Sequence, residues 1–285
     1  MILVTGGTGF VGRRLVARLL SRGEHVRVLS RAGGELPGAE VVRGEVRDLA
    51  AVVPAARGCA AVVNLVGIIR ERAGATFWRV HVEGTRSVVR ACQEAGVERL
   101  VHMSALGARP RARSRYHRSK WEAEELVRSS GQSATIFRPS LIFGQGNRFL
   151  PLLRELVRRP PVIPVIGPGT ALLQPVWVED VVTCLAGALD RPETAGRSYE
   201  LGGPETFAFE QLLDLLAERE RIEKPKVHLP VTLMRLAAQI GRLVPGFPLT
   251  PDQLVMLLED NTCDNREMRE AFGLTPASLL AHLEE

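Results

Sequence analysis

The chain has 285 residues, enough for one large domain with an appended lobe or for two domains. Hydrophobic residues make up 45% and charged residues 24%, a globular balance that excludes disordered and collagen-like chains. The net charge of +5 does not by itself indicate a nucleic acid partner, and we expect none.

The four cysteines lie far apart in the sequence and form no C-x-x-C pair. We therefore predict neither a metal site nor a disulfide framework, and dispersed thiols are typical of a reducing compartment, here the cytoplasm. The first ten residues, MILVTGGTGF, do not have the pattern of a signal peptide. Because no run of about 18 apolar residues occurs, we also expect no transmembrane segment.

The first half of the chain alternates short β-branched runs with longer amphipathic patterns. Predicted strands cover residues 2–5, 25–29, 41–42, 60–65, 99–103 and 134–138. Predicted helices cover residues 10–22, 49–56, 76–95 and 114–130. This alternation is typical of right-handed βαβ units, so we predict an α/β fold with a doubly wound parallel (Rossmann) sheet.

Beyond Pro139 the pattern changes. Prolines cluster in residues 158–169, where we expect regular structure to break. Predicted helices cover residues 149–158, 179–189, 209–219, 231–243, 252–259 and 276–283. We therefore divide the chain into a dinucleotide-binding core, 1–145, to which 170–200 returns, and a smaller, mostly helical substrate or partner lobe, 146–285.

A glycine-rich segment joins the first strand to the first helix, with glycines at 6, 9 and 12. This spacing suits a Rossmann turn, in which glycines permit a tight bend, close approach of a pyrophosphate and close packing of helix on strand. The helix N-terminus then stabilises the phosphate charge. The predicted dinucleotide contacts here are Gly6, Gly7, Thr8, Gly9, Phe10, Val11 and Gly12.

The second strand ends in Ser30 and Arg31, where an NAD-specific protein would carry an acid for the ribose. An arginine fork binds a 2′-phosphate with charge-assisted bonds, and Arg13 in the first helical turn is placed to assist. We therefore predict NADP(H) over NAD(H), with Arg31 as a plain surface residue as the alternative. Asp48 suits either a contact to the adenine amino group or a helix N-cap.

Tyr116 and Lys120 are spaced i and i+4 on a predicted helix and so share one face. A nearby ammonium lowers the pKa of a phenol, which can then give or take a proton while a hydride moves. Only three of the 37 basic residues are lysines, so a lysine here is informative. Ser104 ends the 99–103 strand at the carboxyl edge of the sheet, where its hydroxyl can bind a substrate oxygen.

Taken together, these residues resemble the extended and atypical short-chain dehydrogenase/reductase superfamily. The segments that carry the resemblance are TGGTGFVG, NLVG (64–67), VEGT (82–85), Ser104, YHRSK, RPSLIFGQG (138–146) and QPVWVEDV (174–181). Within it, VVNLVGI, HMSALGA and IFRPSLIFGQGNRFL are most similar to the branch that contains the dehydrogenase-like accessory subunit of mitochondrial respiratory complex I, whose bacterial members are described as NAD(P)-binding, epimerase/dehydratase-like proteins.

The resemblance implies a catalytic triad of Ser104, Tyr116 and Lys120, with Lys120 also binding the nicotinamide ribose. Where the superfamily often has Asn before VEGT, this chain has His81. The resemblance extends the expected cofactor contacts to Leu49, Asn64, Leu65, Val66, Gly67, Pro139 and Ser140.

These patterns predict an NADP(H)-dependent oxidoreductase that acts on a carbonyl, alcohol or quinone-type small molecule. Two alternatives stay open: a non-catalytic NADPH-binding subunit or redox sensor, and a sugar-nucleotide epimerase or dehydratase. The amphipathic segment 231–243 suits either packing on the core, which we favour, or a membrane or partner surface. Peripheral association with a membrane or respiratory complex is therefore a further expectation, and the oligomeric state is left open.

Overall fold

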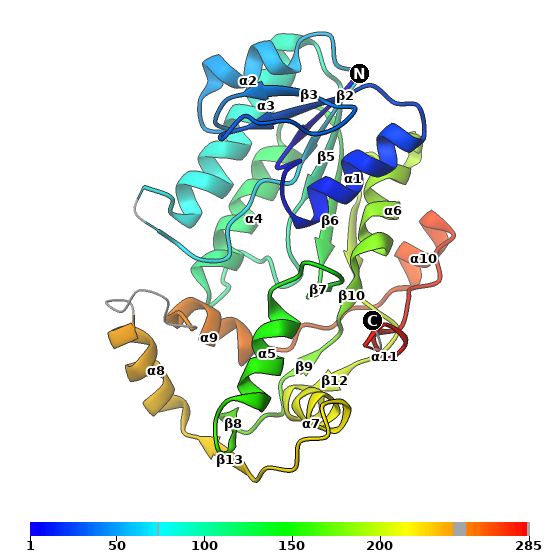
Figure 1. Cartoon of the computed structure of the whole chain (residues 1–285). Helices are drawn as coiled ribbons and strands as arrows, with labels where there is room; N and C mark the ends of the chain where they lie inside the picture. The colour runs from blue at the N-terminus through cyan, green and yellow to red at the C-terminus, as the bar shows by residue number, and fades with distance from the viewer. Residues whose placement is uncertain (73, 242–248, 284–285) are drawn as a thin grey trace.

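The computed structural model describes residues 1–72, 74–241 and 249–283. Its centre is a seven-stranded sheet in the order β11-β6-β5-β4-β1-β2-β3, with every neighbouring pair parallel. The strands are β1 (Ile2–Thr5), β2 (Val26–Ser30), β3 (Glu40–Arg43), β4 (Ala61–Asn64), β5 (Arg99–Met103), β6 (Ser133–Pro139) and β11 (Ser198–Leu201). The predicted doubly wound α/β fold is confirmed (Figure 1).

Helices cover both faces of this sheet because its central strands are apolar on both sides. One face packs against α1 (Phe10–Ser21), α6 (Val178–Leu189) and α10 (Arg266–Phe272). The other packs against α2 (Leu49–Ala56), α3 (Gly84–Ala95) and α4 (Arg115–Arg128). Leu3 and Val4, neighbours in β1, are both fully buried on opposite faces, which shows why this strand has no polar side.

The strand order reverses between β1 and β4. In open α/β sheets this switch point creates a crevice outside the carboxyl ends of the strands, where ligands bind. The glycine-rich turn, the 64–67 segment and Ser104 follow β1, β4 and β5, so all three lie at this edge.

One predicted helix is divided. Residues 76–95 do not form one α-helix: a π-helix, η1 (Trp78–Glu83), precedes α3. The wide turns coincide with buried His81, whose ring is hydrogen-bonded outside its own helix. Short π segments are frequent at functional sites.

A third apolar cluster holds together the elements below the sheet, which we call the C-terminal lobe (Figure 1). Its helices are α5 (Phe149–Arg158), α7 (Phe209–Arg219), α8 (Val231–Ile240), α9 (Pro251–Leu257) and α11 (Leu279–His282). Its short strands pair as β8 (Ile163–Ile166) with β13 (Lys226–Leu229) and β9 (Leu172–Leu173) with β12 (Phe207–Ala208). Between lobe and sheet, β7 (Ile142–Phe143) pairs with β10 (Val176–Trp177), and the 3-10 turn η2 (Pro192–Thr194) precedes β11.

The proline cluster was expected to break regular structure, and at β8 this expectation is wrong. Pro164 lies within β8, opposite Val227 of β13. A two-stranded pair consists of edge strands only, so a residue without an N–H is tolerated where that position would point outward.

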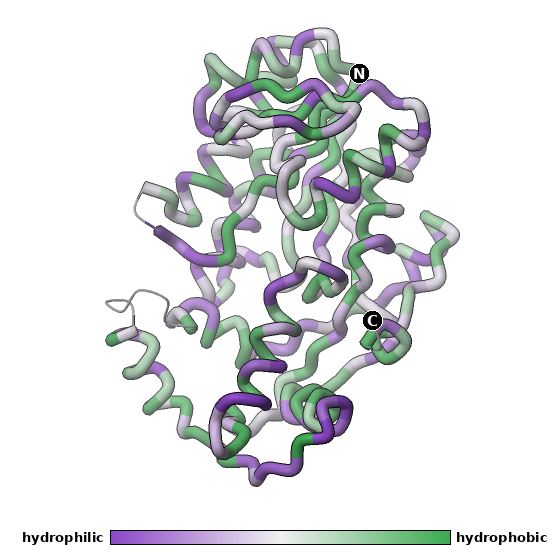
Figure 2. The backbone as a smooth tube through the Cα atoms, in the orientation of Figure 1, coloured by the Kyte–Doolittle hydropathy of each residue, from purple (hydrophilic) through white to green (hydrophobic). Residues whose placement is uncertain are grey.

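The preference for packing α8 against the core is confirmed only in part, because Met234 packs against the apolar cluster of the lobe while most of the helix stays exposed. Only Ala238 is buried in this helix, whereas Leu233, Leu236 and Ile240 are each more than half exposed. Figure 2 shows the hydrophobic residues continuing along this projecting helix. The predicted continuation to residue 243 lies partly outside the described residues. Over the described ranges, no helix combines the length and the apolar character needed to cross a bilayer.

Candidate active site

The turn between β1 and α1 has the geometry of a phosphate cradle. Gly6 has a φ of +76°, which a side chain would strain, and a Cβ on it would lie 3.0 Å from the Leu65 carbonyl carbon. A Cβ on Gly12 would lie 2.1 Å from the Gly6 oxygen, so only glycine fits there. Helix α1 starts after Gly9, without a side-chain cap and without an acid in its first turn. Its first N–H groups therefore suit an anion.

The other residues of the cradle share this turn. Gly7 packs against Val28, since a Cβ there would lie 2.8 Å from that side chain. Thr8 accepts at its backbone oxygen from Arg13 Nε at 2.9 Å, so Arg13 lies over the turn. Phe10 and Val11 are the first two residues of α1.

The end of β2 presents an exposed arginine. Ser30 is buried and donates to the Gly33 oxygen at 3.1 Å, which leaves its hydroxyl engaged in the loop. Arg31 is exposed, and its side chain makes no hydrogen bond or ion pair within the described ranges. Of the two interpretations of Asp48, the structure supports the helix cap: Asp48 accepts from Ala50 N at 3.1 Å, and Leu49 starts α2.

Tyr116 and Lys120 lie on α4, with Ser104 just beyond β5. The Lys120 ammonium is buried and donates to the Met103 oxygen at 3.1 Å, immediately before Ser104. A Cβ on Gly67 would lie 3.1 Å from Lys120 Nζ, so this glycine permits the ammonium to approach the backbone. Helix α4 and two strand ends therefore bring Gly67, Ser104 and Lys120 together.

Ser104 is the residue of this group whose hydrogen bonding is incomplete. Its side chain is 3% exposed, and its Oγ has no partner among the described residues. A buried hydroxyl without a partner is costly and therefore uncommon. A substrate oxygen would satisfy it.

Burial shifts the pKa values of both titratable residues. It raises the pKa of the Tyr116 phenol to about 12 and lowers the pKa of the Lys120 ammonium to about 8, although the Glu124 carboxylate opposes the second shift. We had expected Lys120 to lower the pKa of the phenol. Here burial outweighs any such effect, so Tyr116 is a protonated group at neutral pH.

His81 packs against Tyr116. Its Nε2 accepts from Ile68 N at 3.0 Å, so Nδ1 carries the proton and donates to Ser119 Oγ at 2.8 Å. The His81 ring packs edge-on against the Tyr116 ring, with 5.4 Å between the ring centroids. Burial, with the nearby Lys120 charge, holds the pKa of His81 well below its usual range, so the ring is neutral. The sequence pointed to His81 as a departure but could not show these contacts.

Asn64 was predicted to contact the cofactor, but its side chain is engaged elsewhere. It is buried in a polar network beneath the carboxyl edge of the sheet. It accepts from Thr5 Oγ1 at 2.7 Å and donates to His102 Nδ1 at 3.1 Å. After it, Leu65 is buried and Val66 is half-buried. The polar network joins the ends of β1, β4 and β5.

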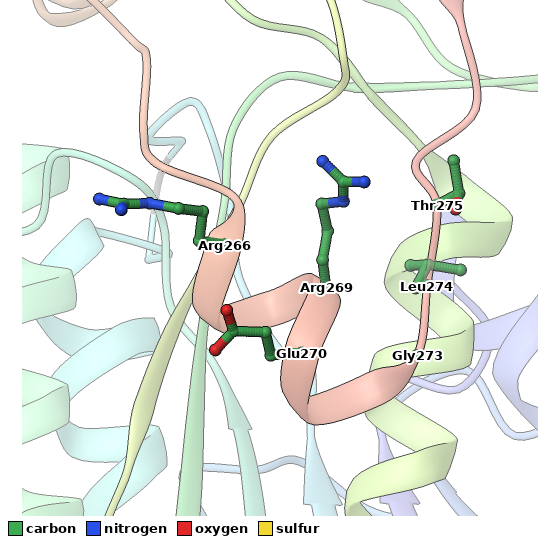
Figure 3. A pocket seen from close by; sticks show the side chains of 6 residues that line it. All are labelled: Arg266, Arg269, Glu270, Gly273, Leu274 and Thr275. Atoms are coloured by element: carbon green, nitrogen blue, oxygen red, sulfur yellow. The ribbon is translucent and has the colours of Figure 1, made fainter.

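The last two predicted contacts follow β6. Pro139 and Ser140 are buried, and Ser140 Oγ donates to Asn261 Oδ1 at 2.6 Å, so this hydroxyl is engaged with the C-terminal lobe. A separate cavity of about 350 Å³ contains none of the predicted site residues; Figure 3 shows that α10 and the segment after it line it. Within the described ranges, no group of three His, Cys, Asp or Glu side chains could hold a metal ion.

Comparison with known proteins decides the family. Residues 2–202 match the model of the NAD dependent epimerase/dehydratase family. The chain belongs to this family.

Two relatives resemble the chain over two thirds or more of its length. Subunit 9 of the NADH dehydrogenase (ubiquinone) 1 alpha subcomplex of Arabidopsis thaliana, a mitochondrial protein, is 30% identical over 98% of this chain and 74% of its own length. Ceramide reductase of Caulobacter vibrioides is 34% identical over 67% of this chain and 62% of that protein. The resemblance to the complex I accessory subunit branch is thus confirmed.

Solved structures support the same assignment. A short-chain dehydrogenase/reductase superfamily protein of Agrobacterium tumefaciens with bound NAD superposes with a TM-score of 0.76 at 25% identity, covering 99% of this chain and 94% of that one. A nucleoside-diphosphate-sugar epimerase of Staphylococcus aureus gives 0.80 at 18% identity, which shows the shared fold alone.

Proposed function

We propose that the protein is an NADP(H)-dependent oxidoreductase that reduces a carbonyl or quinone-type small molecule, with Ser104, Tyr116 and Lys120 as its catalytic residues. The observation that carries the proposal is the buried Ser104 hydroxyl without a partner, at the edge where Lys120 and Gly67 meet. The glycine-rich turn fits a dinucleotide because Gly6 and Gly12 let it pack tightly: a Cβ on either would meet backbone atoms of the turn or of residues 65 and 66.

When bound, the nicotinamide supplies the hydride. The chain's own residues do the rest: the cradle and the N-terminus of α1 hold the phosphates, and the Lys120 ammonium holds the ribose hydroxyls. Ser104 Oγ binds the substrate oxygen. The Tyr116 phenol, protonated because its pKa is about 12, donates a proton to that oxygen as the hydride arrives. The raised pKa keeps the phenol protonated at neutral pH, which is the form that reduction of a carbonyl requires.

The test compares Tyr116→Phe with Tyr199→Phe. Only two tyrosines occur in the chain, and Tyr199 is buried between Phe137 and Phe272, on the face of the sheet opposite α4. With a panel of quinones and carbonyl compounds, we expect NADPH oxidation by Tyr116→Phe to fall by about 100-fold or more. NADPH affinity is expected to stay near that of the wild type, and Tyr199→Phe to retain the rate.

The NADP(H) preference rests on Arg31, which is exposed and makes no hydrogen bond within the described ranges, although its charge also acts on Glu45. We expect Arg31→Ser to weaken NADPH binding by about 10- to 100-fold and to leave NADH binding nearly unchanged, because a charge-assisted bond to the 2′-phosphate is lost. Arg90→Ser, at an exposed arginine of α3, is the matched control. Tighter binding of NADH than of NADPH by the wild type would refute the preference.

The second candidate is a non-catalytic NADPH-binding subunit, favoured by the similarity to complex I subunits over nearly the whole chain. The same panel separates the two candidates. Measurable NADPH binding with no turnover of any compound, and no effect of Tyr116→Phe, would establish the second.

A further inference from the structure

Helix α4, which carries Tyr116, begins with amides that its own sequence does not satisfy. The first N–H groups of a helix have no partner within it. The N-cap Ser114 accepts from only one of them, His117 N, at 3.0 Å. The first turn contains Arg115 and Arg118 and no acid, so its charges oppose the helix dipole. The start of α4 therefore depends on a partner from elsewhere.

That partner is Asp252, in the first turn of α9 in the C-terminal lobe. Its Oδ1 accepts from Arg115 N at 2.7 Å and its Oδ2 accepts from Tyr116 N at 3.0 Å. Both carboxylate oxygens thus bind α4, and one of them binds the backbone of the tyrosine itself. A carboxylate at a helix N-terminus is favourable for both charge and hydrogen bonding.

The lobe holds Asp252 in place. The N-cap Thr250 accepts from Gln253 N at 3.2 Å, and Thr250 N donates to Gln253 Oε1 at 3.0 Å, which forms a capping box around Asp252. Further along the same segment, Glu259 pairs with Arg109 at 2.7 Å on the core side. The contact of Asp252 with α4 is therefore part of the surface along which the lobe packs against the core, and the Asp252 side chain is not free to move alone.

We propose that Asp252 is a positioning residue for Tyr116: it fixes the tyrosine backbone from the lobe and makes the position of the phenol depend on lobe docking. This inference rests on the proposed function. Ser104 and Gly67 follow strands of the sheet, whereas Tyr116 lies at the first turn of a helix. Small displacements of a reacting group cost large factors in rate, so the lobe controls the one group that transfers a proton.

The experiment combines hydrogen exchange with steady-state kinetics on the full chain. We expect Asp252→Ala to speed amide exchange at residues 115 and 116, and to lower kcat by about tenfold or more with an unchanged KM for NADPH, because only the proton donor is displaced. Asp252→Asn keeps one strong acceptor oxygen and is expected to fall between Asp252→Ala and the wild type. General loss of stability, which thermal melting monitors, would instead speed exchange throughout the protein and not at residues 115 and 116 in particular.

Asp260→Asn is the matched control, since Asp260 Oδ1 accepts from Leu172 N within the lobe. It is expected to leave exchange at residues 115 and 116 unchanged. Unchanged exchange in Asp252→Ala would overturn the inference, as would faster exchange with an unaltered kcat. If the wild type reduces no compound, the proposed function fails, whereas the exchange data still decide whether Asp252 holds the Tyr116 backbone.

Discussion

His102 is expected to make the fold sensitive to mild acid. Its side chain is 1% exposed, its Nδ1 accepts from Asn64, and its Nε2 has no partner among the described residues. Burial, together with the charges of Lys120 and Arg128, lowers the pKa of His102 to about 3. The unfolded chain binds this proton near the ordinary value of 6.5, so stability is full above pH 6.5 and falls as the pH drops toward 3.

The size of the effect follows from the two pKa values. Between these two pKa values, each unit by which the pH falls lowers the free energy of unfolding by about 1.36 kcal/mol. His102 alone therefore lowers it by about 2 kcal/mol when the pH falls from 7 to 5. Urea unfolding of the wild type and of His102→Asn at both values measures it. In the variant, an asparagine oxygen replaces Nδ1 as the acceptor for Asn64 but does not titrate. Between pH 7 and pH 5 the free energy of unfolding of the wild type should therefore fall by about 2 kcal/mol more than that of the variant. Equal changes in both proteins would refute the reasoning.

Two further substitutions, each with a control, test the glycine-rich turn and a buried ion pair of α4. Gly12→Ala places a methyl carbon 2.1 Å from a backbone oxygen of the turn, and we expect NADPH affinity to fall by about tenfold or more, measured by fluorescence titration. Gly96→Ala, at a helix end with φ of +68°, should cost about 1 kcal/mol of stability but spare the affinity. Glu124 is fully buried and accepts from Arg138 at 2.7 and 2.9 Å, so Glu124→Gln should cost about 3 kcal/mol in urea unfolding. Exposed Glu125→Gln should change stability by about 0.5 kcal/mol or less, and an equal cost for both would contradict the burial argument.

The sequence predicted six of the seven strands of the sheet, and several helices, because their signals are local, but it missed the edge strand β11. The bounds of β1, α2, β5, α5 and α7 match the predicted ranges, since each is a run of one periodicity closed by a cap or turn. The short strands of the lobe were harder to predict than its helices α5 and α7. Strands of two residues, such as β9 and β12, are too short to show a periodic pattern. Strand β8 contains Pro164, and sequence-based rules treat proline as a residue that ends a strand.

At the site, the sequence identified residues that follow a strand or share a helix face. Ser104, Tyr116 and Lys120 could be named because spacing along one strand end and one helix is a local property. The contacts that hold them could not be predicted. Asp252 reaches Tyr116 across 136 residues of chain, and the Ile68 amide meets His81 only after the π-helix forms. The expected direction of the Tyr116 pKa shift failed for the same reason, because it depends on burial in the folded protein.

The two halves of the site are built in different ways, and this difference bears on function. The dinucleotide half consists of backbone held by glycines that no side chain can replace. The proposed catalytic half depends on side chains from three separate segments: the contacts of His81 and Asp252, and the buried Ser104 hydroxyl, which has no partner among the described residues. A protein that only holds a dinucleotide needs the first half alone. Substitutions in the second half should therefore spare cofactor binding in either case, and only an enzyme should lose a measurable rate with them.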